Sequence, residues 1–260
     1  MNTTTIHYAP KYFSNPNHPI TITVVGCGGT GSRLLPKLGN LDQALLEFGH
    51  PGLMVYVYDN DFIEEHNVLK RQNFLRSDIG KKKASTLVTK YNMIFGTQWK
   101  AFDSFCDSLP KTNIVITCVD KVDFRNRMNL YVNSQRETNK EDYKTNFYWL
   151  DCGNGKDFGQ VVLTTLQEIE QPNSKNFEVK SKLKSVYDIF GDLNQFTTKE
   201  TQGIESCSFI ESNLEQDLFI NEIVSVHAAE LLKGLILDLK LHYQGVVINQ
   251  KSFNNKGIPV

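Results

Sequence analysis

The sequence predicts an α/β fold with a mostly parallel sheet, helices on both faces of the sheet and an antiparallel edge. Three observations predict it. Short apolar runs alternate with helical patterns, which is typical of parallel strands joined by crossover helices. The first run ends in a glycine-rich turn directly before the first helical pattern. Two late strand patterns, at residues 147–152 and 160–166, follow each other with no helix between them, which indicates an antiparallel edge.

The first half of the chain supplies alternating strands and helices. Residues 20–25 form an apolar, β-branched run, and residues 53–58 form a second run that closes on Asp59. Between them, residues 30–48 place leucines at helical intervals. Residues 80–95 repeat the helical spacing, with apolar residues on one side.

The next segment continues the alternation. Residues 98–102 and 113–119 are predicted to be strands, and residues 123–137 are predicted to be a helix. The two late strands then complete the sheet.

The remainder of the chain is less regular. Residues 167–203 are polar and weakly periodic, so we interpret them as a long crossover or mobile loop, partly helical at residues 186–190. Residues 217–241 predict a long helix whose broad apolar surface is either core or a dimer interface. We expect one domain over residues 1–260, with a C-terminal helical and tail region from residue 204.

The bulk composition excludes several classes of protein. A formal net charge of −1 over 260 residues provides no basic field for nucleic acid or an anionic membrane. No apolar run approaches the roughly 18 residues that span a bilayer, and the N-terminus lacks a signal-peptide pattern. We therefore expect a cytoplasmic protein with no nucleic-acid and no membrane partner. Its five cysteines are dispersed, which argues against a disulfide framework and a paired-cysteine zinc site.

The glycine-rich turn is the clearest functional motif. Gly26-Cys27-Gly28-Gly29-Thr30-Gly31 follows a predicted strand and opens a predicted helix. Glycines at Gly26, Gly28, Gly29 and Gly31 allow the backbone to turn tightly and approach a phosphate, which the N–H groups of the helix N-terminus bind. The motif predicts a Rossmann-like nucleotide site, and a plain tight turn is the alternative.

Polar residues further along the chain favour ATP over NAD. Asp59 ends the second strand, where a carboxylate can accept hydrogen bonds from a ribose, although it can also cap the next turn. A triphosphate needs cations and a carboxylate that holds magnesium. Arg71 and Lys83 are candidates for the cations, and Asp120 is the candidate for the magnesium ligand.

Taken together, five motifs resemble the ThiF/MoeB superfamily of ubiquitin-like-modifier-activating enzymes. They are the glycine turn at residues 26–31, an Asp-x-Asp strand end at Asp59 and Asp61, and an Asn followed by Arg-Gln at Asn67 and Arg71-Gln72. The other two are a Gly-x-x-Lys helix start at residues 80–83 and a Cys-x-Asp strand end at residues 118–120. Arg125 also matches. The resemblance to the narrower ThiF family proteins of PRTRC systems extends over the whole chain, and includes Ser206-Cys207-Ser208 and the Ile258-Pro259-Val260 ending.

The sequence departs from the superfamily pattern in two ways. It lacks the zinc-binding cysteine pairs that are common in MoeB-like relatives, and one motif has a different spacing. Three residues, Val68, Leu69 and Lys70, separate Asn67 from Arg71, where the family usually has two. Lys70 is therefore a possible substitute for the arginine.

The resemblance implies an adenylyltransferase that uses ATP and Mg²⁺. The substrate would be the C-terminal carboxylate of a ubiquitin-like carrier protein, activated as an acyl-adenylate. Gly26, Gly28, Gly29, Gly31, Asp59, Asp61, Asn67 and Lys83 would bind the nucleotide. Lys83 and Arg71 would stabilise phosphate charge, and Asp120 would hold magnesium. A homodimer is also implied.

Two further points stay open at the level of sequence. Cys207 is a candidate to capture the acyl group as a thioester, or it is an ordinary small residue near a helix start. The function also has alternatives: an NAD-dependent oxidoreductase, a non-catalytic scaffold that binds nucleotide and a ubiquitin-like partner, or an activating enzyme for a short peptide or sulfur carrier.

Overall fold

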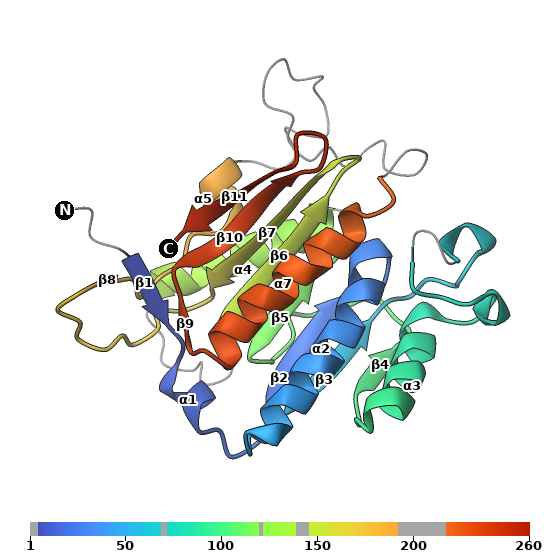
Figure 1. Ribbon diagram of the computed structural model, residues 1–260, viewed down its shortest axis with the longest axis horizontal. Helices are drawn as coiled ribbons and strands as arrows, with labels where there is room; N and C mark the ends of the chain where they lie inside the picture. The colour runs from blue at the N-terminus through green and yellow to red at the C-terminus, as the bar shows by residue number, and fades with distance from the viewer. Residues whose placement is uncertain (1–4, 69–71, 120–121, 139–145, 192–216) are drawn as a thin grey trace.

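The computed structural model describes residues 5–68, 72–119, 122–138, 146–191 and 217–260. In these residues an eight-stranded sheet has helices on both faces, and a three-stranded sheet accompanies it (Figure 1). The predicted fold class is therefore confirmed.

The elements occur in the following order. The strands are β1 (Thr5–Tyr8), β2 (Ile20–Val25), β3 (Leu53–Tyr58), β4 (Lys100–Phe102), β5 (Ile114–Thr117), β6 (Tyr148–Asn154), β7 (Phe158–Thr165), β8 (Glu178–Val179), β9 (Lys240–Leu241), β10 (Tyr243–Asn249) and β11 (Asn254–Pro259). The helices are α1 (Lys11–Ser14), α2 (Gly29–Glu47), α3 (Lys83–Phe95), α4 (Val122–Thr138), α5 (Val186–Phe190) and α7 (Ile220–Ile236), with 3₁₀ turns η1 (Glu65–Asn67) and η2 (Arg76–Asp78).

The large sheet has a parallel part built around β2. Its order is β11-β10-β7-β6-β5-β2-β3-β4, and β2 pairs in parallel with β3 on one side and β5 on the other. The chain passes from β2 to β3 and β4 in one direction and then returns to β5 across β2. The carboxyl ends of β2 and β5 therefore form the switch point of the sheet, which is the usual binding edge of an open α/β fold.

The other part of the sheet is antiparallel. β6 and β7 form a hairpin, as the two adjacent strand patterns predict, and β10 and β11 extend this edge. Residues 204–260 were predicted to form a helical and tail region, so these two strands were not predicted. The reason is that β11 is rich in asparagine and mostly exposed, and its pairing with β10 is non-local.

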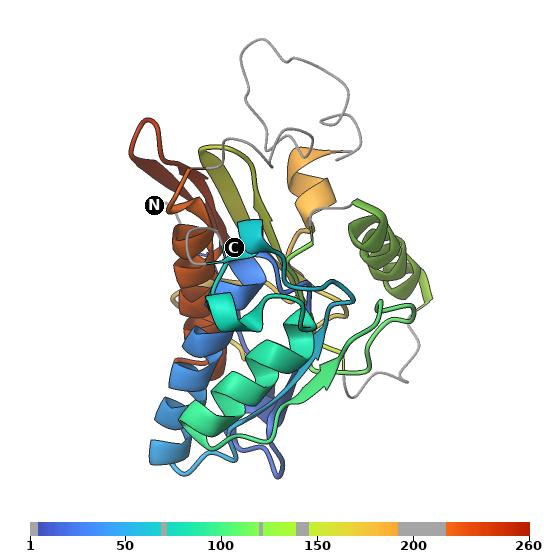
Figure 2. The same ribbon diagram turned by 90° about the vertical axis from the view of Figure 1, so that its right-hand side faces the viewer.

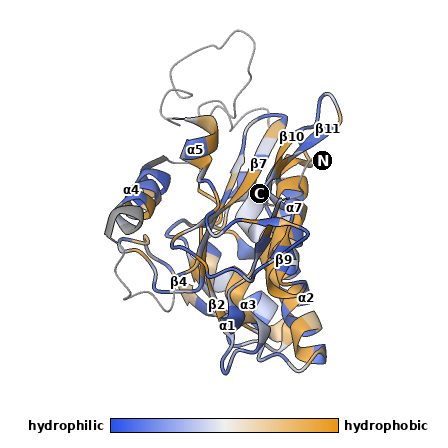
Figure 3. Ribbon diagram, turned by 90° about the vertical axis from the view of Figure 1, so that its left-hand side faces the viewer, coloured by the Kyte–Doolittle hydropathy of each residue, from blue (hydrophilic) through white to orange (hydrophobic). Residues whose placement is uncertain are grey.

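The two faces of the sheet carry different helices. The larger core packs α2, α3 and α7 against one face, and a smaller core packs α4 and α5 against the other (Figure 2). Figure 3 shows that α7 is largely hydrophobic, whereas α4 mixes both kinds of residue. The buried side of α7, including Val224, Ala228 and Leu232, belongs to the larger core.

Several predicted boundaries were wrong in detail. α3 begins at Lys83 and not at residue 80, because Lys82 is extended and forms a bridge with Phe62. The predicted helix at residues 217–241 is shorter at both ends, and Lys240–Leu241 form β9. In the polar stretch 167–203, the predicted short helix is confirmed as α5, and β8 is an additional strand.

None of the helices in the described residues combines the length and the apolar character that crossing a membrane demands.

Candidate functional site

The glycine-rich turn lies at the carboxyl end of β2, against the ends of β3 and β5. Gly26 has a φ of +95°, a left-handed conformation that glycine adopts without strain, and its N–H donates to the Tyr58 carbonyl oxygen at 2.9 Å. A Cβ at Gly26 would lie 2.5 Å from the carbonyl oxygen of Cys118. A Cβ at Gly31 would overlap the Gly26 carbonyl oxygen. The fold itself therefore requires glycine at Gly26 and Gly31.

Gly28 has a different environment. A Cβ built at Gly28 meets nothing within 4 Å, and its φ of −70° is negative, as in most residues. Gly28 immediately precedes α2, and among the described residues no side chain caps the start of that helix. The first N–H groups of a helix bind anions when no cap occupies them. The open position at Gly28 fits the approach of a phosphate, and its role in nucleotide binding stays a prediction.

Asp59 follows β3 and reaches back to the glycine turn. Its Oδ2 accepts a hydrogen bond from the Cys27 N–H at 2.6 Å, and its Oδ1 accepts one from the Asp61 N–H at 2.9 Å. Burial raises the pKa of Asp59 above 3.8, while these two donors and the Lys83 charge oppose that shift. Asp59 therefore caps the turn that follows it and also lies against the glycine turn. A ribose contact, the predicted role, is compatible with both.

Lys83 is buried at the first position of α3, with its side chain 8% exposed. Its Nζ pairs with Asp61 Oδ2 at 2.9 Å, and its N–H donates to the Asp61 carbonyl oxygen at 3.1 Å. Burial raises the pKa of the Cys27 thiol and of Asp59, and the Lys83 charge opposes that shift in both. Contacts through Asp61 and Asp59 link the Lys83 ammonium group to the glycine turn, because Asp61 donates its N–H to Asp59 and Asp59 accepts from Cys27. The structure thus brings Asp59, Asp61 and Lys83 together at the turn.

Asn67 has a local structural role. It is buried in η1, where its Oδ1 accepts a hydrogen bond from the Glu64 N–H at 2.8 Å and its own N–H donates to the Glu64 carbonyl oxygen at 3.0 Å. This reciprocal pair caps the 3₁₀ turn. The predicted contact of Asn67 with a nucleotide stays a prediction.

Three other predicted site residues, Arg71, Asp120 and Cys207, lie outside the described residues. The cation at the pyrophosphate, the magnesium ligand and the thioester cysteine therefore stay predictions. Within the part of the chain that the structure describes, no group of three or more His, Cys, Asp or Glu side chains could hold a metal.

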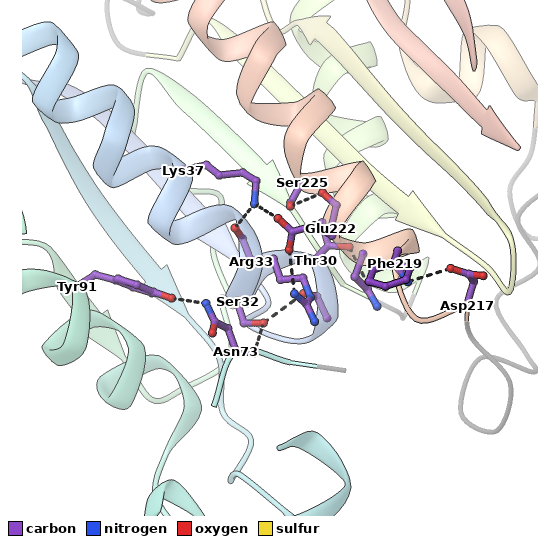
Figure 4. Close-up of polar contacts among 12 residues, drawn as sticks. Thr30, Ser32, Arg33, Lys37, Asn73, Tyr91, Asp217, Phe219, Glu222 and Ser225 are labelled. Atoms are coloured by element: carbon purple, nitrogen blue, oxygen red, sulfur yellow. Dashed lines mark hydrogen bonds and ion pairs between the residues drawn. The ribbon is translucent and has the colours of Figure 1, made fainter. Parts of the chain in front are cut away.

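The segment after Arg71 is anchored to the start of α2. The Asn73 N–H donates to Ser32 Oγ at 3.1 Å, and Asn73 Nδ2 donates to the Tyr91 hydroxyl of α3 at 2.7 Å (Figure 4). Ser32 Oγ also donates to the Gly29 carbonyl oxygen at 3.2 Å. These contacts were not predicted, because isolated serines and asparagines carry no signal in the sequence without the tertiary contact.

The start of α7 also contacts the start of α2. Asn221 Oδ1 accepts hydrogen bonds from Thr30 Oγ1 at 3.1 Å and from Asn154 Nδ2, at the end of β6, at 2.9 Å. On the next position, Glu222 pairs with Arg33 at 2.9 Å and with Lys37 at 2.5 Å (Figure 4). No role was predicted for these residues, because the α2 and α7 partners lie about 190 positions apart.

The described cysteines and Arg125 have structural environments. Cys27, Cys106, Cys118 and Cys152 are buried, and none of them forms a disulfide within the described residues. Arg125 is fully buried, and its Nε donates to Asp151 Oδ1 at 2.7 Å. This ion pair joins the first turns of α4 to β6.

Comparisons with known proteins concern the fold. At the level of sequence, no protein-family model and no curated protein matches the chain. Among solved structures, E. coli MccB with ATP matches with a TM-score of 0.57 and 14% identity, over 92% of this chain and 63% of that one. The microcin C7 biosynthetic enzyme MccB in complex with N-formylated MccA matches with a TM-score of 0.58 and 16% identity, over 92% and 64%. PaaA matches with a TM-score of 0.58 and 10% identity, over 93% and 64%.

The sequence identities to these solved structures are low. The chain spans a little less than two thirds of the length of the MccB and PaaA chains. At 10–16% identity the likeness concerns the fold and not the activity. The chain has a Rossmann-like α/β fold that is similar to the fold of MccB and PaaA.

Proposed function

We propose that this protein uses ATP to activate the C-terminal carboxylate of a polypeptide as an acyl-adenylate. One observation carries the proposal: the glycine turn that is open at Gly28, the Asp59 carboxylate and the buried Lys83 ammonium meet at the switch point of the sheet. A phosphate chain needs backbone N–H donors and positive charge in one place, and this edge provides both. The fold of MccB, which has been crystallised with ATP, supports the proposal.

The reaction needs little covalent chemistry from the protein. An oxygen of the carboxylate attacks the α-phosphorus, a new P–O bond forms, and the bond to the bridging oxygen breaks so that pyrophosphate leaves. The glycine-turn N–H groups and Lys83 stabilise the phosphate oxygens, and Asp59 orients the ribose. Catalysis then rests on positioning and on electrostatic stabilisation.

Asp61 has a distinct part in this proposal. Its carboxylate is 60% exposed, whereas the Lys83 side chain that it pairs with is 8% exposed. Without nucleotide, Asp61 compensates the buried charge of Lys83, since an unpaired buried ammonium is costly. Being near the surface, the carboxylate is free to yield to a phosphate oxygen.

The finer features of the proposal rest on the resemblance of the sequence to ThiF-like proteins of PRTRC systems. They are a ubiquitin-like carrier as substrate, magnesium held by Asp120, assistance from Arg71, a thioester at Cys207, a homodimer and a cytoplasmic location. For magnesium, the carboxylate of Asp120 is a suitable oxygen ligand, and the ion would neutralise phosphate charge.

A second candidate function is a scaffold that binds nucleotide without chemistry. Two observations favour it: the extra residue between Asn67 and Arg71, and the use of Asn67 Oδ1 to cap its own turn. An NAD-dependent oxidoreductase is the third candidate, and it leaves the buried Lys83 without a role.

Exchange of labelled pyrophosphate into ATP tests these candidates. The protein is incubated with ATP, magnesium and the candidate ubiquitin-like carrier, and mass spectrometry then follows the adenylate and a thiol-sensitive adduct on Cys207. Carrier-dependent exchange supports the enzyme. Binding of ATP without exchange supports the scaffold, and preferential binding of NADH supports the oxidoreductase.

Lys83→Met is the variant that links this activity to the described site. Because Lys83 supplies the buried positive charge, exchange should fall about 100-fold, the size expected for a lost charge-stabilising donor. Lys82→Met is the matched control: Lys82 is the adjacent lysine, and its Nζ contacts the Asn60 carbonyl oxygen and the Phe62 ring. Equal activity of the two variants would contradict the role of Lys83.

A further inference from the structure

The start of α7 contacts the glycine turn through one buried side chain, Asn221. It is the second residue of α7 and only 4% exposed. Its Oδ1 accepts from Thr30 Oγ1 in the first turn of α2 and from Asn154 Nδ2 at the end of β6. One side chain thus joins the ends of three elements at the candidate nucleotide site.

The contact reaches the backbone of the turn as well. A Cβ at Gly29 would overlap the Asn221 amide, so the glycine backbone packs directly on this side chain. Asn221 is therefore in contact with two consecutive residues, Gly29 and Thr30, whose N–H groups lie in the first turn of α2. Asparagine in a first helical turn commonly bonds to its own backbone, but here its Oδ1 is directed to α2 and β6.

An ion-pair cluster reinforces this junction on its outer side. Glu222 lies between Arg33 and Lys37, two cations one turn apart on α2 (Figure 4). Burial acts to raise the pKa of Glu222, but the hydrogen bonds from Lys37 and Arg33 outweigh it and lower that pKa, so the carboxylate stays charged. The cluster joins the start of α7 to the first turns of α2, beside the contact that Asn221 makes with Thr30.

We infer that Asn221 is a positioning residue that holds the glycine turn in the conformation that binds a phosphate. The inference rests on the proposed function for the identity of the ligand. Fixing Thr30 and Gly29 from outside the turn prevents the first N–H groups of α2 from fraying. A preorganised set of donors binds an anion more tightly than a mobile set, because less ordering is left for the ligand to impose.

The test compares Asn221→Ala with Ser225→Ala. Ser225 is a matched control: it is buried one turn further along α7, and its Oγ donates to the Glu222 carbonyl oxygen of its own helix. ATP affinity is measured by calorimetry. Amide hydrogen exchange is measured without nucleotide at residues 32–34, the first N–H groups of α2 that donate within the helix, beginning with Ser32 to the Gly28 carbonyl oxygen. For Asn221→Ala we expect ATP binding about tenfold weaker, the effect of one lost hydrogen-bonded contact, and faster exchange confined to residues 32–34. Ser225→Ala should change neither.

A double-mutant cycle separates the contact with Thr30 from a general loss of stability. Thr30→Val keeps the shape of the side chain and removes the hydroxyl donor. If Asn221 acts through Thr30, the two substitutions together should weaken ATP binding less than the product of their separate effects. If Asn221→Ala does not fold, Thr30→Val alone removes the hydrogen bond from the other side and leaves α7 intact, and the same exchange measurement applies.

Two results would be decisive against the inference. Wild-type exchange rates at residues 32–34 in Asn221→Ala would overturn it, as would independent effects of Thr30→Val and Asn221→Ala. Failure of the wild-type protein to bind ATP is a different result: it would remove the proposed function, and hydrogen exchange of the turn would still decide whether Asn221 positions it.

Discussion

At the scale of single residues, Asp59 and Lys83 each have two roles in the candidate site. Asp59 accepts from Cys27 in the glycine turn and from Asp61 in the next turn. Lys83 begins α3 and provides a buried positive charge. The sequence motifs identified Asp59, Asp61 and Lys83 as candidate site residues. They did not predict that Asp61 pairs with Lys83, because that contact depends on where α3 begins.

The glycines of the turn separate a binding role from a folding role. Gly28→Ala adds a methyl group to open space, so the protein should fold with nearly unchanged stability. The variant should bind ATP at least about tenfold more weakly, because the methyl group occupies the space through which a phosphate approaches. Gly31→Ala forces a clash with the Gly26 carbonyl oxygen and should lower stability itself. Thermal unfolding and ATP titration of both variants check this. Unchanged ATP affinity in Gly28→Ala would contradict a phosphate contact there.

Because His7 is buried, we expect the stability of the protein to depend on pH. His7 is fully buried, with Nδ1 2.6 Å from the Lys180 carbonyl oxygen and Nε2 2.7 Å from the Tyr148 hydroxyl. The carbonyl can only accept, so Nδ1 carries the proton and Nε2 accepts from Tyr148 in the neutral ring. Burial lowers the pKa of His7 below 6.5, although the hydrogen bond to Lys180 opposes this.

The sign of the effect follows from linkage. The unfolded chain binds a proton near pH 6.5 and the folded chain only at lower pH, so the contribution of His7 to stability is full above pH 6.5 and is lost as pH falls from there through the folded pKa. We expect the melting temperature of His7→Asn to depend less on pH between about 7.5 and 5 than that of the wild type. His18→Asn, at an exposed position, is the control and should behave like the wild type.

At the scale of elements, the helices and strands with strong periodicity were predicted, whereas the short strands β1, β8 and β9 and the polar strand β11 were not. β2, β3 and α2 lie within one or two residues of their predicted ranges, because their apolar spacing is regular over a full element. β1, β8 and β9 have only two to four residues and pair with each other across the chain, so no local pattern marks them.

α4 illustrates how one buried pair fixes an element to the sheet. Arg125 and Asp151 are both fully buried, and Asp151 also accepts from Thr117 Oγ1 at 2.6 Å. Arg125→Met would leave the Asp151 carboxylate buried without its cation, which should cost about 3–5 kcal/mol of unfolding free energy. Denaturant unfolding measures this. The additional change Asp151→Asn should restore part of the loss by removing the uncompensated charge.

The control for this prediction is Arg127→Met on the same helix. Arg127 is exposed, and its guanidinium donates to the carbonyl oxygens of Asp107 and Cys106. Its replacement should cost less than about 1 kcal/mol. Comparable losses for the two arginines would show that the Arg125 ion pair is not what fixes α4.

At the scale of the whole molecule, the end of the chain belongs to the sheet. β10 lies between β7 and β11, and it buries Gln244, Val246 and Ile248. The interpretation of this region as a tail followed local composition, in which the asparagines and lysines of β11 indicate a loop. Pairing with a hairpin about 80 residues earlier outweighs that local tendency.

Truncation tests this arrangement. A chain that ends after residue 242 loses β10 and β11, exposes the edge of β7 and should lose cooperative unfolding. A chain that ends after residue 251 loses only the mostly exposed β11 and should keep a cooperative transition at a lower denaturant concentration. Circular dichroism during urea unfolding measures both. Cooperative unfolding of the shorter chain at the wild-type midpoint would mean that β10 is dispensable.

The sequence by itself determined the α/β class, the glycine turn and the acid that follows β3, because periodicity and a contiguous motif are local properties of the chain. The tertiary structure alone decided that Asp61 pairs with Lys83, that Asn73 and Asn221 brace the start of α2, and that the last residues complete the sheet. These contacts join residues up to about 190 positions apart. The crossover connections decide which residues meet, because they bring the ends of the strands to one edge of the sheet. No local sequence pattern encodes those pairings.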